Sequence, residues 1–385
     1  MVKSFLKNNY FPLVLCACSC FYFFLFYKQS LGIDYPSDLR EHITFAMDAV
    51  HQPSKAYSLL HKLLVCLAWL FSFTPVDATF LFSMLMVSML VLSVIAAILV
   101  VYFFLKEKYP HANILHIQCI SISLLTLSMM IPTSLAGNVY LGIGTPNPWH
   151  NATYLFCKPF SLLTFIYFTK LLTNPQKNNA ISDYLFLSVF GILSMWAKPS
   201  FMLIFLPAVA IVSSIALARR QMHWKRFIGI GLVLLPSFIP LYFIHSNVYL
   251  QADDAKIIFT NGEVWRHFYK NIPIALLLAA AFPMYVILLR LRHLSYPLLL
   301  AFLVWITGCC VFYFIAEDGY RFYHGNFSWS YLFGLMILFF VTSDEFFFQK
   351  NIRGNYFNIG LLLFAAHVLS GLVYFTRLLL GYGYQ

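Results

Sequence analysis

The chain has 385 residues, of which 61% are hydrophobic and only 10% are charged, whereas soluble domains carry roughly 25% charged residues. Apolar runs of about 20 residues, the length that a helix needs to cross a bilayer, recur along it without strict alternation, which excludes a soluble core and a β-barrel. The net charge is +11. Because basic residues in a multi-pass membrane protein mostly mark its cytoplasmic loops, we expect no nucleic-acid partner. These features predict an all-α, polytopic transmembrane helical bundle that forms a single domain over residues 1–385.

The hydrophobic runs predict about eleven membrane spans, each close to the length that a bilayer requires. The segment 58–73 is also apolar, but His61 and Lys62 interrupt it and Pro75 follows its end. It is therefore predicted to be a re-entrant or interfacial helix that does not cross. The predicted spans are 11–27, 79–105, 113–132, 153–173, 181–197, 200–218, 227–245, 272–290, 298–316, 328–343 and 356–376.

Basic residues set the predicted orientation. With the N-terminus in the cytoplasm, the basic clusters of the short loops all fall on the inner side, as the positive-inside rule requires. The C-terminus then lies outside, and we expect a multi-pass protein of a bacterial inner (plasma) membrane. The inner basic residues are Lys106, Lys108, Lys170, Lys177, Arg219, Arg220, Lys225, Arg226, Arg290, Arg292, Lys350 and Arg353.

Acidic residues gather on the predicted outer side. Acidic side chains contribute little to membrane insertion, so their clustering indicates polar chemistry at that face. Two outer loops are long: residues 28–78 are predicted to contain amphipathic helices, and residues 246–271 form a candidate lid. The outer acidic residues are Asp34, Asp38, Glu41, Asp48, Asp77, Asp253, Asp254, Glu263, Glu317 and Asp318.

The first outer loop opens with residues 34–42, DYPSDLREH. Ser37 or Asp38 can cap the helix that follows the proline, and Asp38 and His42 would share one helix face at i and i+4. Such a pair can orient a carboxylate as a base, or it can bind a divalent cation such as Mg²⁺ or Mn²⁺. The alternative is a solvated interfacial helix without a chemical role.

A second motif lies at residues 144–151, GTPNPWHN, directly before the predicted span 153–173. Its two prolines fix the backbone, so that Trp149, His150 and Asn151 would meet a substrate at the interface. An aromatic anchor in the membrane interface is the alternative.

Lys158 and Lys198 each precede a proline at the outer end of a predicted span. For both lysines the ordinary behaviour is snorkelling to the interface. Neutralisation of a lipid phosphate is the alternative.

A third motif, residues 317–329 (EDGYRFYHGNFSW), places acid, base, imidazole, amide and aromatic side chains in one short outer loop. Arg321 can bind phosphate oxygens bidentately, and His324 and Asn326 lie beside it in the sequence. Tyrosine and tryptophan offer flat apolar faces for a sugar. This motif favours substrate binding.

The order of these parts resembles the GT-C superfamily of membrane glycosyltransferases. The resemblance covers the architecture and residues 1–110, in which one inward N-terminal span precedes a long outer loop that opens with aspartates. In that superfamily a first-loop carboxylate acts at the active site and the donor is a polyprenyl-phosphate or pyrophosphate sugar. Asp38, with Asp34 second, matches that position, and residues 57–64 resemble the apolar segment that follows it. The chain has no Asp-x-Asp motif.

The resemblance implies a glycosyltransferase that uses a polyprenyl-phosphate-linked sugar at the outer face, with a glycan or lipid acceptor, in cell-envelope glycan synthesis or modification. An O-antigen-type polysaccharide polymerase, with Arg266 and Arg321 in two outer loops, is one alternative. A lipid or solute transporter (flippase), which would want charges buried within spans, is another. The expected site residues are Asp38 and Asp34 as catalytic groups, and His42, Trp149, His150, Asn151, Lys198, Arg321, His324 and Asn326 for substrate binding.

Overall fold

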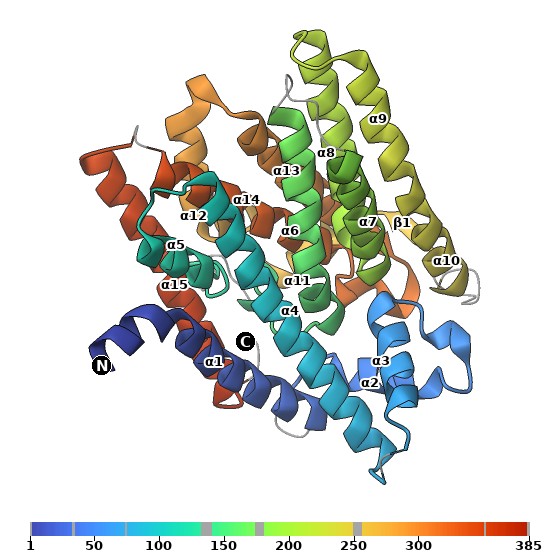
Figure 1. Ribbon diagram of the computed structural model, residues 1–385. Helices are drawn as coiled ribbons and strands as arrows, with labels where there is room; N and C mark the ends of the chain where they lie inside the picture. The colour runs from blue at the N-terminus through green and yellow to red at the C-terminus, as the bar shows by residue number, and fades with distance from the viewer. Residues whose placement is uncertain are drawn as a thin grey trace.

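The computed structural model describes residues 2–32, 35–73, 75–131, 141–173, 181–248, 256–349 and 352–382 (Figure 1). Over these ranges, nine helical segments are long and apolar enough to cross a bilayer. The chain is therefore a multi-pass integral membrane protein. The helices are α1 (Val2–Leu31), α2 (Leu39–Asp48), α3 (Leu59–Leu70), α4 (Ala78–Lys108), α5 (Ile114–Ser123), α6 (Ala152–Thr173), α7 (Ile181–Ala197), α8 (Pro199–Ala218), α9 (Trp224–Leu234), α10 (Phe238–Val248), α11 (Glu263–Phe268), α12 (Ile272–Arg290), α13 (Tyr296–Phe314), α14 (Ser328–Phe348) and α15 (Asn355–Leu379), with a 3-10 helix at Gly319–His324 and strands β1 (Ile257–Phe259) and β2 (Ile315–Glu317).

Helix α4 illustrates how the sequence forms a span. Its 31 residues reach about 46 Å at 1.5 Å per residue, more than the hydrocarbon core requires. The Asp77 carboxylate accepts the backbone N–H of Phe80 at 3.0 Å and caps the first turn. Lys106 and Lys108 lie in the last turn, where cations interact favourably with the helix dipole. Apolar side chains surround the rest of the helix because it faces both lipid and protein.

Of the eleven predicted spans, nine are confirmed as helices long and apolar enough to cross a membrane within the described parts of the chain. Helix α7 has the bounds predicted for the span 181–197, but its 17 residues put it at the lower limit for crossing. The predicted span 113–132 is wrong as a continuous helix, because α5 ends after only 10 residues. Helix α3, predicted not to cross, has 12 residues and covers about 18 Å.

The chain beyond α5 is non-helical within the bundle. The Thr126 hydroxyl donates to the carbonyl of Ser123 at 2.9 Å, a local bond that competes with helix propagation. The backbone N–H of Ser128 then donates to the carbonyl of His367 at 3.2 Å, and that of Met130 to the carbonyl of Leu278 at 3.1 Å. Residues 124–131 thus pair with α15 and α12, which satisfies backbone groups that lipid cannot.

His367 connects this segment to a kink in α12. Its Nδ1 lies 2.7 Å from the carbonyl oxygen of Ser128, and its Nε2 accepts the backbone N–H of Phe282 at 3.4 Å. Ala280 departs from helical geometry one turn before Pro283, whose ring clashes with a straight helix. One turn further along α15, a Cβ atom added to Gly371 would lie 1.3 Å from the Thr126 carbonyl oxygen, so only glycine fits.

The bundle has two different ends. At one, which we call the ion-pair end, α4, α6, α12 and α14 finish and α7 and α13 begin. Its salt bridges join Lys108 to Asp344 at 2.5 Å, Lys170 to Asp183 at 3.0 Å and Arg290 to Glu345 at 3.6 Å.

The other end, which we call the cavity end, carries α2 and α3 (Figure 1). The Tyr35 hydroxyl there donates to the carbonyl of Leu379, the last residue of α15, at 3.2 Å. The start of α1 packs against the far part of α4, with the rings of Phe11 and Tyr102 4.8 Å apart. Phe11 of α1 therefore lies nearer the ion-pair end, and Leu379 of α15 lies at the cavity end.

Candidate functional site

A cavity of about 1490 Å³ opens at the cavity end. Its walls come from α2, the starts of α6 and α8, α10, and the connection between α13 and α14. It is larger than most small-molecule pockets, which measure roughly 300–1,000 Å³. Residues predicted for the site that line it are Asp38, His42, Asn151, Lys198, Arg321, His324 and Asn326.

Asp38 stands at the N-cap of α2, but its carboxylate does not cap the helix. The backbone N–H of Asp38 donates to the carbonyl of His150 at 3.1 Å, which fixes the start of α2 against the second motif. The Ser37 hydroxyl donates to the same carbonyl at 3.0 Å and accepts the N–H of Leu39 at 3.1 Å. One carboxylate oxygen of Asp38 accepts the Asn151 amide at 2.7 Å. The carboxylate is thus oriented by an amide at the cavity wall.

Lys198 lies across Asn151 from Asp38. Its backbone is extended (φ −160°, ψ 113°) because Pro199 begins α8 directly after it. The ammonium donates to the Asn151 carbonyl oxygen at 3.1 Å and to the Thr153 hydroxyl at 2.9 Å, and it lies 4.8 Å from the centre of the Trp329 ring. Burial lowers the pKa of Lys198 to about 8, against the attraction of Asp38.

Asn151 therefore separates the two charges. Its amide nitrogen serves the carboxylate of Asp38 and its amide oxygen serves the ammonium of Lys198. Because the amide is rigid and both of its ends are used, acid and base keep a fixed spacing. Both groups remain exposed to the cavity, where a substrate can meet them.

A second polar wall comes from strand β2 and the 3-10 helix Gly319–His324. Strand β2 pairs antiparallel with β1, with Ile257 opposite Glu317; the all-α prediction missed this pair. The buried Glu317 carboxylate accepts the Asn326 amide at 2.6 Å. Arg321 donates from Nε to the Tyr320 hydroxyl at 2.9 Å. Gly319 and Gly325 both have positive φ, 71° and 66°, and form the turns that bound this wall.

The remaining wall is apolar, and the sequence analysis did not foresee it. Phe238, Leu241, Tyr242 and Ile244 of α10 line the cavity together with Leu203 of α8. Tyr242 is 68% exposed, so this wall also forms part of the outer surface of the bundle. Nothing in the residues of the α10 segment marks it as different from an ordinary span. Its role in the cavity is a result of tertiary packing alone.

Some predicted site residues lie away from the cavity. Trp149 is fully buried with its ring 4.9 Å from Tyr22 and 5.5 Å from Phe375, so it is neither at the cavity nor an interfacial anchor. His150 is buried behind the wall, 5.6 Å from the Trp329 ring, and burial lowers its pKa to about 4. Asp34 lies outside the described residues, as do Asp253 and Asp254 of the candidate lid.

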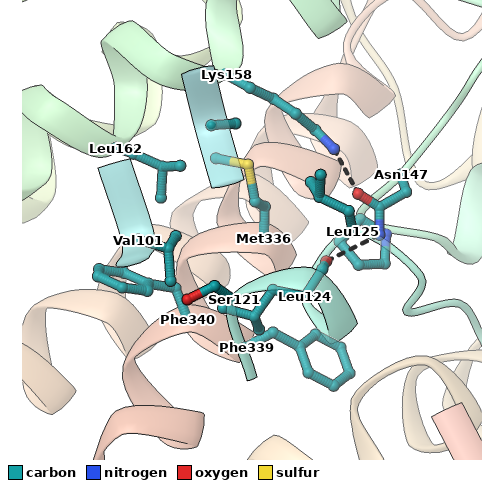
Figure 2. A pocket seen from close by; sticks show the side chains of 12 residues that line it. Val101, Ser121, Leu124, Leu125, Asn147, Lys158, Leu162, Met336, Phe339 and Phe340 are labelled. Atoms are coloured by element: carbon teal, nitrogen blue, oxygen red, sulfur yellow. Dashed lines mark hydrogen bonds between the residues drawn. The ribbon is translucent and has the colours of Figure 1, made fainter. Parts of the chain in front are cut away.

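Lys158 does not snorkel. It is 1% exposed and donates to the Asn147 side-chain oxygen at 2.5 Å, beside a small cavity of about 20 Å³. Figure 2 shows this contact together with the bond from the Asn147 amide to the carbonyl of Leu124. A second bond reaches the carbonyl of Leu127 at 3.0 Å. Snorkelling fails because most residues of α6 are buried within the bundle, which leaves the ammonium no path to the interface.

In the described part of the chain, no three His, Cys, Asp or Glu side chains form a group that could hold a metal ion; the expected divalent cation stays a prediction. Comparison of the chain with protein-family models and with curated proteins gives no match. Fold and cavity thus define a class: a multi-pass helical membrane protein with a polar cavity at one end of the bundle.

Proposed function

We propose that the protein is a GT-C-like membrane glycosyltransferase that moves a sugar from a polyprenyl-phosphate donor to a glycan or lipid acceptor. The observation that carries this proposal is the convergence of Asp38, Lys198 and Arg321 on one cavity with an apolar wall. A polyprenyl chain would lie along α10 while the phosphate and the sugar occupy the polar part. Aromatic faces such as that of Trp329 suit a sugar ring.

The reaction is a single displacement at the anomeric carbon. Asp38 accepts the proton of the acceptor hydroxyl as the acceptor oxygen forms its bond to that carbon. The bond from the anomeric carbon to the phosphate oxygen breaks, and the polyprenyl phosphate leaves with the electron pair. Lys198 and Arg321 stabilise the negative charge that develops on the leaving phosphate. The sugar is transferred with inversion.

The proposed reaction takes place at the outer face. Support comes from the ion-pair end, where the basic residues of the turn between α8 and α9 lie with Lys108, Lys170 and Arg290. Basic loops mark the cytoplasmic side, so the ion-pair end would face the cytoplasm and the cavity end the exterior. A lipid-linked donor would enter from the outer leaflet.

The alternatives have less support. Arg266, the second arginine of the polymerase interpretation, is exposed on α11 and does not line the cavity. A transporter would want polar groups available within the spans, but two of those in the described spans, Lys158 and His367, are held by hydrogen bonds to Asn147 and to the backbone. Groups fixed in this way hold the bundle together.

The test is sugar transfer by the purified protein in phospholipid vesicles, with a panel of radiolabelled polyprenyl-phosphate sugars. Asp38→Asn should lower the rate by about 10²-fold or more, because the amide cannot accept the proton. The matched control is Asp48→Asn on the same helix, whose carboxylate pairs with Lys55 at 2.6 Å and does not line the cavity. Full activity of Asp38→Asn, or equal loss in both variants, would contradict the proposal.

A further inference from the structure

Two histidines form a pair at the edge of the cavity, one lining it and one behind it. His42 Nδ1 lies 2.9 Å from His61 Nε2, so the two rings share one hydrogen bond. His42 lines the cavity, whereas His61 of α3 is fully buried. The Nδ1 atom of His61 is buried, and no described residue bonds to it. The mutual orientation of the rings follows from α2 and α3 packing side by side at the cavity end (Figure 1).

The unbonded nitrogen decides which ring donates. If His42 donated from Nδ1, neutral His61 would carry its proton on its own Nδ1, a buried N–H without an acceptor that costs roughly 1–3 kcal/mol. If His61 donates from Nε2, its Nδ1 is only a bare acceptor, which is tolerated more readily. His42 then accepts at Nδ1 and carries its own proton on Nε2.

Both rings are held in the neutral form. Burial, then the positive charge of Lys198, lowers the pKa of His61 to about 4. Burial lowers the pKa of His42 well below its usual value, and His61 and Lys198 lower it further. At neutral pH the pair therefore contains one shared proton and one proton on His42 Nε2. Neither imidazole carries a second proton in this arrangement.

We propose that His61 is a positioning residue that fixes His42 as the Nε2–H tautomer, so that His42 offers the cavity a neutral hydrogen-bond donor. The ligand group is a phosphate oxygen, because His42 and the ammonium of Lys198 line the same cavity and an N–H donor combined with an ammonium suits an oxyanion. This last step rests on the proposed function. The tautomer itself does not.

The decisive measurement is the protonation pattern of His42 in ¹⁵N-histidine-labelled protein in lipid nanodiscs, with the signal assigned by its loss in His42→Gln. The expected result is a protonated Nε2 and a bare Nδ1 at pH 7. A proton on His42 Nδ1 would overturn the inference, whatever the protein binds. In His61→Leu the fixed pattern should give way to a mixture of tautomers, which a purely structural role of His61 would not cause.

Binding of farnesyl phosphate tests the donor role. His61→Leu should raise the Kd by about 2- to 10-fold, the range of one ordinary hydrogen bond. His61→Gln, which retains an N–H near the position of the imidazole Nε2–H, should bind like the wild type. The matched control is His51→Leu, an exposed residue in the turn that follows α2. Equal affinities in His61→Leu and wild type contradict the donor role, whereas no binding by wild type contradicts the proposed function and leaves the tautomer standing.

Discussion

Lys158-Pro159 and Lys198-Pro199 have the same local sequence and opposite environments. Lys198 precedes the first residue of α8 and faces a cavity of about 1490 Å³. Lys158 lies inside α6 beside a space of about 20 Å³, enough for little more than one water molecule. The ammonium of Lys198 donates to Asn151 and faces the open cavity. The ammonium of Lys158 is closed in by Asn147 and by the rings of Trp149 and Tyr154, each 5.4 Å away.

The difference teaches that a lysine near the end of an apolar span can do more than snorkel to the interface or neutralise a lipid phosphate, the two roles expected from the sequence. Lys198 is available to a ligand, whereas Lys158 holds Asn147, which in turn binds the carbonyls of Leu124 and Leu127. The first lysine belongs to the candidate site. The second organises the non-helical segment beyond α5. Substitutions can separate these two roles.

The largest effect is expected from Asn147→Leu. This change leaves the Lys158 amine without its acceptor and removes the donor to two backbone carbonyls, so the free energy of unfolding should fall by about 3 kcal/mol or more. Unfolding by SDS titration in mixed micelles measures it. Adding Lys158→Met should recover part of the loss, because the unpaired buried charge is removed. A loss below about 0.5 kcal/mol would show that the Lys158–Asn147 contact is dispensable.

A smaller effect, on affinity in place of stability, is expected from Lys198→Met. The affinity for farnesyl phosphate should fall by about 10- to 100-fold, as the loss of a hydrogen bond to a charged group predicts. The unfolding transition should stay within about 1 kcal/mol, since the variant also removes a buried charge. Lys158→Met is the matched control and should bind with unchanged affinity. If both variants bind equally well, the two lysines do not differ in the way proposed.

The smallest effect near neutral pH is a pH dependence that belongs to Lys198 alone and approaches the effect of Lys198→Met only well above pH 8. Since burial lowers its pKa to about 8, the ammonium is charged below that pH and loses its charge as the pH rises through it. The affinity of the wild type for farnesyl phosphate should therefore fall above pH 8 toward that of Lys198→Met. Lys198→Arg should remove the fall, because arginine keeps its charge. A wild-type affinity that stays constant to pH 10 would contradict the assignment.

The sequence predicted most of the spans, because an apolar run of sufficient length has few alternatives to a membrane helix. The prediction failed at residues 124–131, because an apolar sequence does not distinguish a membrane helix from an extended segment buried in the bundle. Partners on α12 and α15, such as His367, decide the conformation there. No local pattern contains that information.

For the site, the clustering of polar residues on the predicted outer side indicated a common location for Asp38, Lys198 and Arg321. Their roles stay predictions. The burial of Trp149 and Lys158 was not predictable, because aromatic and basic residues near a span end have the same sequence signature whether they face lipid or the bundle. The apolar wall on α10 was missed for the same reason. His61 was treated only as an interruption of an apolar run, since its partner lies on another helix.

The contact between Ser128 and His367 has a consequence for the order of assembly. The two residues are 239 positions apart, so at roughly 5–20 residues per second the ribosome needs about 10–50 s to deliver the second after the first. Until then the backbone groups of residues 124–131 lack their partners on α15, and each would cost several kcal/mol in lipid. Until α15 is inserted, the backbone groups of this segment must therefore be hydrogen-bonded by water, by the insertion machinery or by other parts of the chain. Helix α15 thus supplies the partners that close this part of the bundle, and a chain truncated before α15 would leave the backbone N–H and C=O of Ser128 unpaired within the membrane.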